Sequence, residues 1–314
     1  MVAQQLASHQ TRAAGESLTP VNFLSYFLVQ LDMRANRSRE LIRVAICVIF
    51  LAVASAALTA QENPQQLVKE TVDNELHVNQ QQNYWMYRDS DTEHGKAKVS
   101  RVVETPECWF RWMLSINGQP LTPAEEKQQQ AKINTLVNSP AARQKDHAAI
   151  EQDGNKAENL MKMLPSAFLY TYAGEKEGNV RLNFTPNPQF HPPTDAAKVF
   201  HSMQGYVLIN RREKRLAGIS GTLMQNVDFG WGILGKLDKG GTFKVRQTQL
   251  APNDWEVTTL DVHIHGRALF FHTISEDQTE VKTEFQPVPA NTSLAQAAAL
   301  AQHGNLNASA SANP

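Results

Sequence analysis

The feature that most limits the possible folds of this sequence is a series of short apolar segments separated by turns between residues 168 and 285. Gly, Pro, Asn and charged residues mark the turns, as at 210–213, 239–241 and 251–254. A single short helix, expected over 195–203, interrupts the series, which excludes the strand–helix alternation of a parallel sheet. The pattern therefore predicts an antiparallel meander. Its candidate strands are 168–172, 179–185, 205–210, 215–228, 242–250, 255–265 and 268–285.

Three more strands are expected before the meander, at 84–87, 98–105 and 108–116. Ahead of them, apolar residues recur at helical spacing after a proline that suits a first helical turn. This spacing predicts an amphipathic helix over 64–77.

A polar segment at 122–165 separates the early strands from the meander. A capping-box pattern at 122–125 opens a helix toward Val137, and a second helix is expected between Pro140 and Pro165. Both helices have narrow apolar stripes, so we expect them to lie on the sheet rather than to form a core. The sequence thus predicts a mainly β fold with α elements. The expected architecture is an open antiparallel barrel or curved sheet with lid or inserted helices.

A signal peptide is predicted over 33–60. Four arginines precede an uninterrupted small and apolar run at 44–58, and polar residues follow Ala60. The run has about 15 residues, fewer than the roughly 18–20 that span a bilayer. An uncleaved N-terminal anchor is the alternative interpretation. We expect the mature chain to begin close to Gln61.

The remaining boundaries follow from composition. Residues 1–32 lie ahead of Met33, which starts a conventional leader, so we interpret them as a mis-called N-terminal extension. The β domain is expected over 61–289. Residues 290–314 are rich in Ala, Asn, Ser and Gln, which predicts a disordered tail containing a short helix at 294–301.

Charge and cysteine content exclude some classes of function. Lys and Arg together number 30 and Asp and Glu 31, without long runs of one sign, so a nucleic-acid partner is not expected. Of the two cysteines, Cys47 lies in the leader and Cys108 in an apolar strand. The mature chain is expected to have no intramolecular disulfide, and Cys108 to be a buried, inert thiol.

Three segments resemble those of a known fold. They are GYVLINRREKRL at 205–216, VDFGWGILGKLDKGGTF at 227–243 and WEVTTLDVHIHGRALFF at 255–271. The first resembles the strand–charged turn–strand hairpin of the LolA/LolB-like lipoprotein-carrier fold. Together they resemble exported bacterial proteins of unknown role that are labelled as related to outer-membrane lipoprotein sorting. The resemblance implies an open barrel around an apolar cavity, with helices as a lid. No residue matches the functional arginine of the carriers.

Large side chains suggest where such a cavity would lie. On the strand 108–116, Phe110, Trp112 and Leu114 share an apolar face, which we assign to the core. The other face is mixed, so Trp109 and Met113 are assigned to a cavity wall or a lid contact. The full set of expected ligand-cavity residues is Trp85, Trp109, Met113 and Trp231.

Two other patterns are similar to those of metal or cofactor sites. Asp261, His263 and His265 alternate on one face of a strand, with His272 beyond, a weak candidate set for a metal ion. Their face is opposite the apolar one, so we interpret them as surface residues. The glycines at 230–235 spell a dinucleotide-binding pattern, but a turn follows too soon for the required helix. We therefore expect neither a metal nor another cofactor.

The features together predict an exported, non-catalytic protein of the periplasm or cell envelope that binds a lipid or another hydrophobic ligand. It would be peripheral to the envelope rather than membrane-spanning. The alternative is a structural or interaction module of the envelope without a small ligand. A metal-dependent enzyme that uses the histidine cluster is a third, less favoured interpretation.

Overall fold

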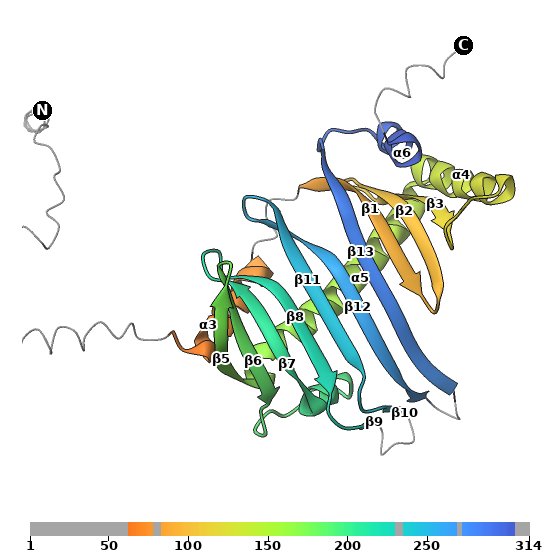
Figure 1. The fold of residues 1–314 in the computed structure, drawn as a ribbon. Coiled ribbons are helices and arrows are strands. Elements are labelled where there is room, and N and C mark those ends of the chain that lie inside the picture. Colours follow the sequence, from red (N-terminus) through yellow and green to blue (C-terminus); the bar gives the residue numbers. More distant parts are fainter. Residues whose placement is uncertain (1–61, 78–82, 230–234, 269–271, 305–314) are drawn as a thin grey trace, which may run out of the picture. The chain divides into compact units, whose positions relative to one another are not determined.

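The computed structural model describes residues 62–77, 83–229, 235–268 and 272–304. The expected signal peptide and N-terminal extension lie outside these residues. The described part is mainly β, with one large antiparallel sheet and helices packed on it (Figure 1). The sheet is curved but not closed, since β4 and β5 form its two edges. The fold class predicted from the turn-punctuated pattern is thereby confirmed.

The strand order is β4-β3-β2-β1-β13-β12-β11-β8-β7-β6-β5, with β9 and β10 attached beside β12. Successive strands are mostly neighbours, as expected for a meander. The strands are β1 (Tyr84–Glu93), β2 (Lys96–Glu104), β3 (Trp109–Ile116), β4 (Gln119–Pro120), β5 (Phe168–Lys176), β6 (Asn179–Pro186), β7 (Met203–Asn210), β8 (Arg215–Leu223), β9 (Val227–Phe229), β10 (Gly235–Leu237), β11 (Thr242–Ala251), β12 (Asp254–Ala268) and β13 (His272–Val288).

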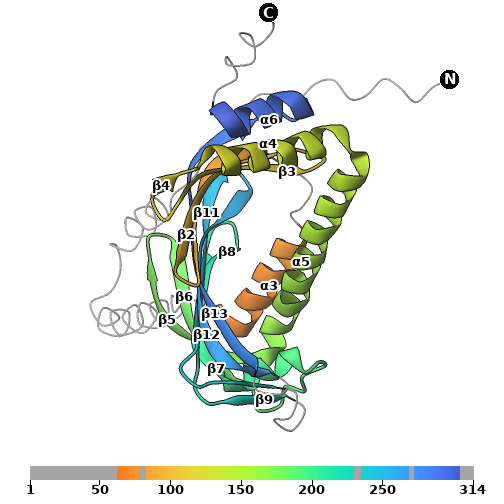
Figure 2. The ribbon, with the colours of Figure 1, turned by 90° about the vertical axis from the view of Figure 1, so that its right-hand side faces the viewer.

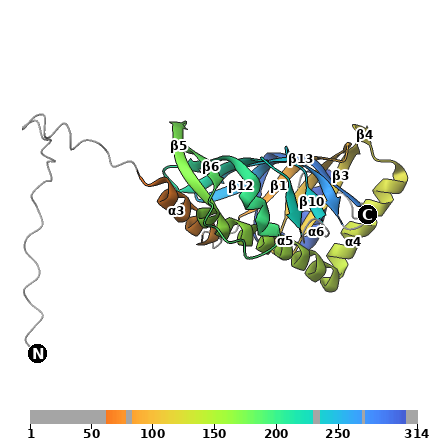
Figure 3. The same ribbon diagram turned by 90° about the horizontal axis from the view of Figure 1, so that it is seen from below.

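The helices are α3 (Pro64–His77), α4 (Pro123–Asn138), α5 (Pro140–Ala167), the 3-10 helix η1 (Ala196–Ser202) and α6 (Leu294–His303). Figure 2 shows α3 and α5 on one side of the curved sheet, and Figure 3 shows the same arrangement from below. Within the described residues, no helix combines the length and the apolar character needed to cross a membrane.

The larger core lies where α3 and the end of α5 cover β5 to β8. Leu67, Val68 and Val72 of α3, which recur at helical spacing, are buried against this part of the sheet. Phe168 and Phe184 are fully buried, with ring centroids 4.4 Å apart. This core fixes α3 and the C-terminal end of α5 against the sheet.

A second core lies on the opposite face, at the β1–β3 end. Met86, Val103 and Phe110 are paired across three neighbouring strands, so their side chains lie on one face of the sheet. The residues before and after each of them point to the other face, on which α5 lies. They pack with Ile133 of α4 and with the alanines of α6. The helices that join the two cores, α4 and α5, meet at Ser139, which caps α5 through its side chain.

Several boundaries differ from the sequence-based predictions: the expected strand 84–87 continues to Glu93, and the expected strand 215–228 is divided into β8 and β9. The helix α5 continues through Pro165 to Ala167, where a side chain from α3 binds the carbonyl groups at the helix end. Gln65 supplies this contact, since its amide donates to the Pro165 and Phe168 oxygens. The helix expected at 294–301 is present as α6, and its Ala297 and Ala301 are fully buried.

Candidate functional site

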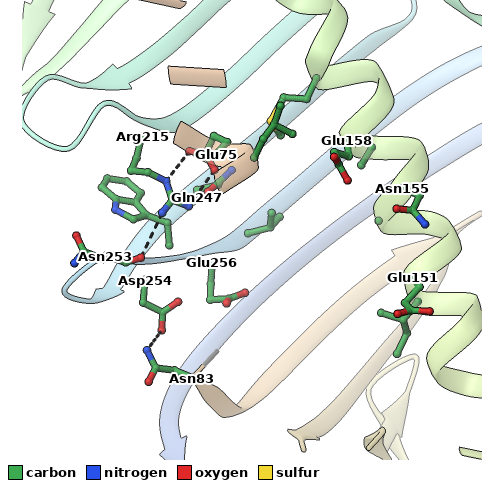
Figure 4. A pocket seen from close by; sticks show the side chains of 17 residues that line it. Glu75, Asn83, Glu151, Asn155, Glu158, Arg215, Gln247, Asn253, Asp254 and Glu256 are labelled. Carbon is green, nitrogen blue, oxygen red and sulfur yellow. Dashed lines mark hydrogen bonds and ion pairs between the residues drawn. The ribbon is translucent and has the colours of Figure 1, made fainter. Parts of the chain in front are cut away.

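A cavity of about 810 Å³ lies between the middle of α5, the end of α3 and the β11–β12 hairpin (Figure 4). It exists because α5 packs closely on the sheet only near its C-terminus, where Leu164 and Ala167 are buried. Around Gly154 the helix has left the sheet and is exposed. The side chains that line the cavity are those of Glu75, Leu76, Asn83, Ile150, Glu151, Asn155, Ala157, Glu158, Met161, Arg215, Gln247, Asn253, Asp254, Trp255, Glu256 and Val257, together with Gly154.

An ion pair at one end of the cavity joins α3 to the sheet. The Arg215 guanidinium donates from Nε to Glu75 Oε1 at 2.8 Å and from Nη2 to Oε2 at 3.0 Å. The Leu216 amide also donates to Glu75, at 2.7 Å, and Arg215 Nη1 reaches the Asn253 carbonyl at 3.3 Å. Both side chains are more than nine-tenths buried. The pair therefore fixes the end of α3 beside the β11–β12 turn.

The aromatic wall of the cavity is held by hydrogen bonds. Trp255 Nε1 donates to Glu213 Oε2 at 2.9 Å, and Gln249 donates to both oxygens of the same carboxylate. These donors lower the pKa of Glu213, the bond from Trp255 most of all. The indole of Trp255 consequently has a fixed orientation before any ligand binds.

Two carboxylates of β12 form the acidic wall. Asp254 accepts hydrogen bonds from Asn83 Nδ2 at 2.9 Å and from Trp85 Nε1 at 3.0 Å. The carboxylate of Glu256, two residues further along the strand, has no hydrogen-bond or ion-pair partner among the described residues. Burial raises the pKa of Glu256, and the neighbouring charge of Asp254 raises it further.

A third carboxylate lies behind this wall. Glu104 is 7% exposed and accepts the Trp85 backbone amide at 3.1 Å. Burial, and then the charge of Glu256, raise the pKa of Glu104 to about 7. Three carboxyl groups, those of Glu104, Asp254 and Glu256, thus lie near one another beside the cavity.

Part of the remaining lining is apolar. Leu76, Ile150, Met161 and Val257 provide aliphatic and thioether surface from both helices and from the sheet. A molecule with one apolar and one polar end would match both kinds of wall.

The residues expected to line a cavity lie in different places. Trp85 is buried and packs edge-to-face on Phe285, with centroids 6.3 Å apart. It lines a separate hollow of about 320 Å³, next to the larger one. Trp231 lies outside the described residues. Trp109 and Met113 do not contribute to the larger cavity, because β2, β1 and β13 separate β3 from β12.

On β3, the burial of the side chains otherwise differs between the two faces as the alternation of the sequence predicts. Phe110 is fully buried and Trp112 packs against the same core, while Trp109 on the other face is 36% exposed. Leu114 falls at a bulge opposite β2, so its environment is less regular than that of Phe110. Cys108 is buried, and burial raises the pKa of its thiol to about 11, which fits an inert cysteine.

The histidine cluster lies on the face opposite Leu260, Val262 and Ile264, as the alternation predicts. His263 is 3.1 Å from both Asp261 and Asp277, whose carboxylates raise the pKa of its imidazole. Among the residues that the structure describes, no group of three or more His, Cys, Asp or Glu is placed to hold a metal ion. The side chain of His272, like residues 230–234 of the glycine pattern, is outside the described set.

Sequence reasoning missed Glu75, Arg215, Asp254 and Glu256. Each stands in a polar context, at the end of a helix or beside a turn, where charged residues are normally solvated. Spacing could not bring Glu75 and Arg215 together, since 140 positions separate them. A faint signal is the pair of carboxylates flanking Trp255 in the segment DWEV at 254–257.

No protein-family model matches this chain, and no curated protein matches its sequence significantly. The likeness to lipoprotein carriers remains a prediction from the sequence pattern. The function must therefore be argued from the geometry of the cavity.

Proposed function

We propose that this chain is a non-catalytic binding protein that holds a small amphipathic, lipid-like molecule in the cavity between α5 and the sheet. The observation that carries the proposal is the cavity itself, about 810 Å³ with both apolar and charged walls. Binding sites for small molecules are usually concave and largely preformed, and their volumes are roughly 300–1,000 Å³. The volume suits a single ligand of moderate size.

The roles of the polar side chains favour binding over chemistry. Arg215 and Glu75 join two elements, Glu213 orients Trp255, and Asp254 holds the Trp85 side chain. These contacts stabilise the walls of the cavity in one arrangement. A preformed site loses less conformational entropy on binding, which increases affinity.

The cell-envelope location belongs to the same proposal and depends on the leader at 33–60. We predict that the mature protein begins close to Gln61. N-terminal sequencing of the envelope fraction tests this prediction, and a protein that still carries Met1 or Met33 would refute cleavage.

Native mass spectrometry of protein extracted under mild conditions tests ligand binding. We expect a small-molecule adduct of one ligand per chain. A ligand-free protein that also takes up no N-phenyl-1-naphthylamine, a neutral fluorescent apolar probe, would overturn the proposal. That result would favour the alternative of an envelope interaction module without a small ligand.

A further inference from the structure

We infer that the ligand of this cavity carries a positively charged group, such as an amine or a quaternary ammonium, on an apolar body. This inference rests on the proposed function and specifies the chemistry of its ligand. It is drawn from the numbers of acidic and basic side chains that line the cavity and from the hydrogen bonds and ion pairs that each of them already forms.

The lining contains five carboxylates and a single cation, Arg215. Arg215 is committed to Glu75 through two hydrogen bonds, and both groups are buried. Its charge is therefore balanced without a ligand. A negatively charged head group would find no free cationic side chain among the residues that line this cavity.

Two of the other carboxylates have partners on their own helix. Glu151 lies 3.5 Å from His147, and Glu158 lies 2.6 Å from Lys162. Each pair is an exposed contact between neighbouring turns of α5. Lys162 balances the charge of Glu158, and both carboxylates lie on α5, on the other side of the cavity from β12.

Asp254 and Glu256 lie together on β12, and neither carboxylate contacts a Lys or Arg side chain among the described residues. The hydrogen bonds to Asp254 come from neutral donors, Asn83 and Trp85. Glu256 has no hydrogen-bond or ion-pair partner among the described residues, and Lys282 and Arg215 act on it only at longer range. A cation placed between these two carboxylates would reduce their mutual repulsion.

The neighbouring walls suit the rest of such a molecule. Trp255 adds an aromatic side chain to the lining. Ile150, Met161 and Val257 then offer apolar contact for a hydrocarbon body. An amphipathic cation would therefore satisfy both kinds of wall, whereas a fatty acid would bring a carboxylate toward two others.

Isothermal titration of the full chain with two matched ligands tests the inference. Dodecylammonium and dodecanoate have the same apolar body and opposite charges, and both are used below the concentration at which micelles form. We expect dodecylammonium to bind on the order of tenfold more tightly or better, and the difference to shrink at high salt.

Variants locate the effect. Glu256→Gln removes one charge from a side chain without hydrogen bonds, so we expect it to fold and to weaken dodecylammonium binding several-fold. Glu177→Gln changes an exposed carboxylate in the β5–β6 turn and should leave binding unchanged. Unfolding curves of both variants confirm that any loss of binding is not a loss of structure.

The outcomes separate the inference from the proposed function. Equal binding of the two ligands, or tighter binding of dodecanoate, would overturn the cationic ligand and leave the binding cavity standing. Binding of neither ligand would overturn the inference, and would contradict the proposed function only if N-phenyl-1-naphthylamine also failed to bind. Tight dodecylammonium binding that Glu256→Gln leaves unchanged would also overturn it.

Discussion

Glu104 shows how the fold changes the chemistry of a single residue. Its carboxyl is 7% exposed beside Glu256, and its pKa is raised from 4.5 to about 7. A carboxyl with a raised pKa binds its proton more tightly in the folded state than in the unfolded state. Its contribution to stability is therefore present at low pH and is lost as the pH rises from about 4.5 through 7.

We expect Glu104→Gln to remove this contribution. Between pH 5 and pH 8, the free energy of unfolding of the wild type should fall by about 2 to 3 kcal/mol more than that of the variant. The neutral Gln oxygen can still accept the Trp85 amide, so the variant should fold. Urea unfolding at both pH values measures the difference, and parallel pH dependence of the two proteins would contradict the raised pKa.

The Glu75–Arg215 pair gives a second residue-scale prediction. Removing one partner of a buried pair leaves an unbalanced charge, so Glu75→Ala should lower the free energy of unfolding by about 3 to 5 kcal/mol. Glu70→Ala, on the same helix, removes a partner from the partly exposed Lys214 and should cost far less. Equal losses in urea unfolding would mean that Glu75 does not join α3 to the sheet.

At the scale of elements, the sequence predicted most of the fold because local signals agree with tertiary packing. The start of α4 follows from a capping box that the structure contains, with Thr122 accepting the Glu125 amide. The two faces of β3 follow from simple alternation. The ends of helices were harder to predict from the sequence. The contact of Gln65 with the end of α5, for example, joins positions 100 residues apart.

The tail shows a different limit of sequence reasoning. The helix at 294–301 was expected, but its packing was not, because a run of alanines carries little information about burial. Small side chains allow α6 to approach the sheet closely, and Arg101 Nη1 donates to the Ala301 and Gln302 carbonyl oxygens at its end, at 3.1 and 3.2 Å. An arginine near the last carbonyl groups also interacts favourably with the helix dipole.

The faces of β3 can be compared by truncation. We expect Trp112→Ala to lower the melting temperature much more than Trp109→Ala, because Trp112 packs against the α4–α6 core and Trp109 is 36% exposed. Thermal unfolding followed by circular dichroism measures both. Equal shifts would contradict the assignment of faces and would indicate that Trp109 is buried in solution.

For the whole molecule, the cavity depends on features that no local pattern encodes. The sheet curves, α5 diverges from it, and the β11–β12 hairpin brings Asp254 and Glu256 under the helix. Sequence reasoning predicted an open curved sheet with helices over it, yet placed two of its four cavity candidates on β3, away from this cavity. The mixed polarity of the walls was also not predicted, because it arises from residues of five separate elements, α3, α5, β8, β11 and β12.

Gly154 offers a direct way to fill this cavity. It lies on the cavity side of α5, and a side chain added there meets no atom within 4 Å of its Cβ. Gly154→Trp should therefore occupy the cavity without disturbing the helix, in which glycine is unfavourable. Gln152→Trp places the same side chain at an exposed position outside the cavity lining and serves as the control.

Fluorescence titration of N-phenyl-1-naphthylamine with the wild type and these two variants tests the central claim most directly. The probe is neutral, so the result does not depend on the charge of the natural ligand. We predict that Gly154→Trp binds the probe at least about tenfold more weakly than the wild type, whereas Gln152→Trp binds it equally well. Equal binding by all three proteins would show that the cavity between α5 and the sheet is not the binding site.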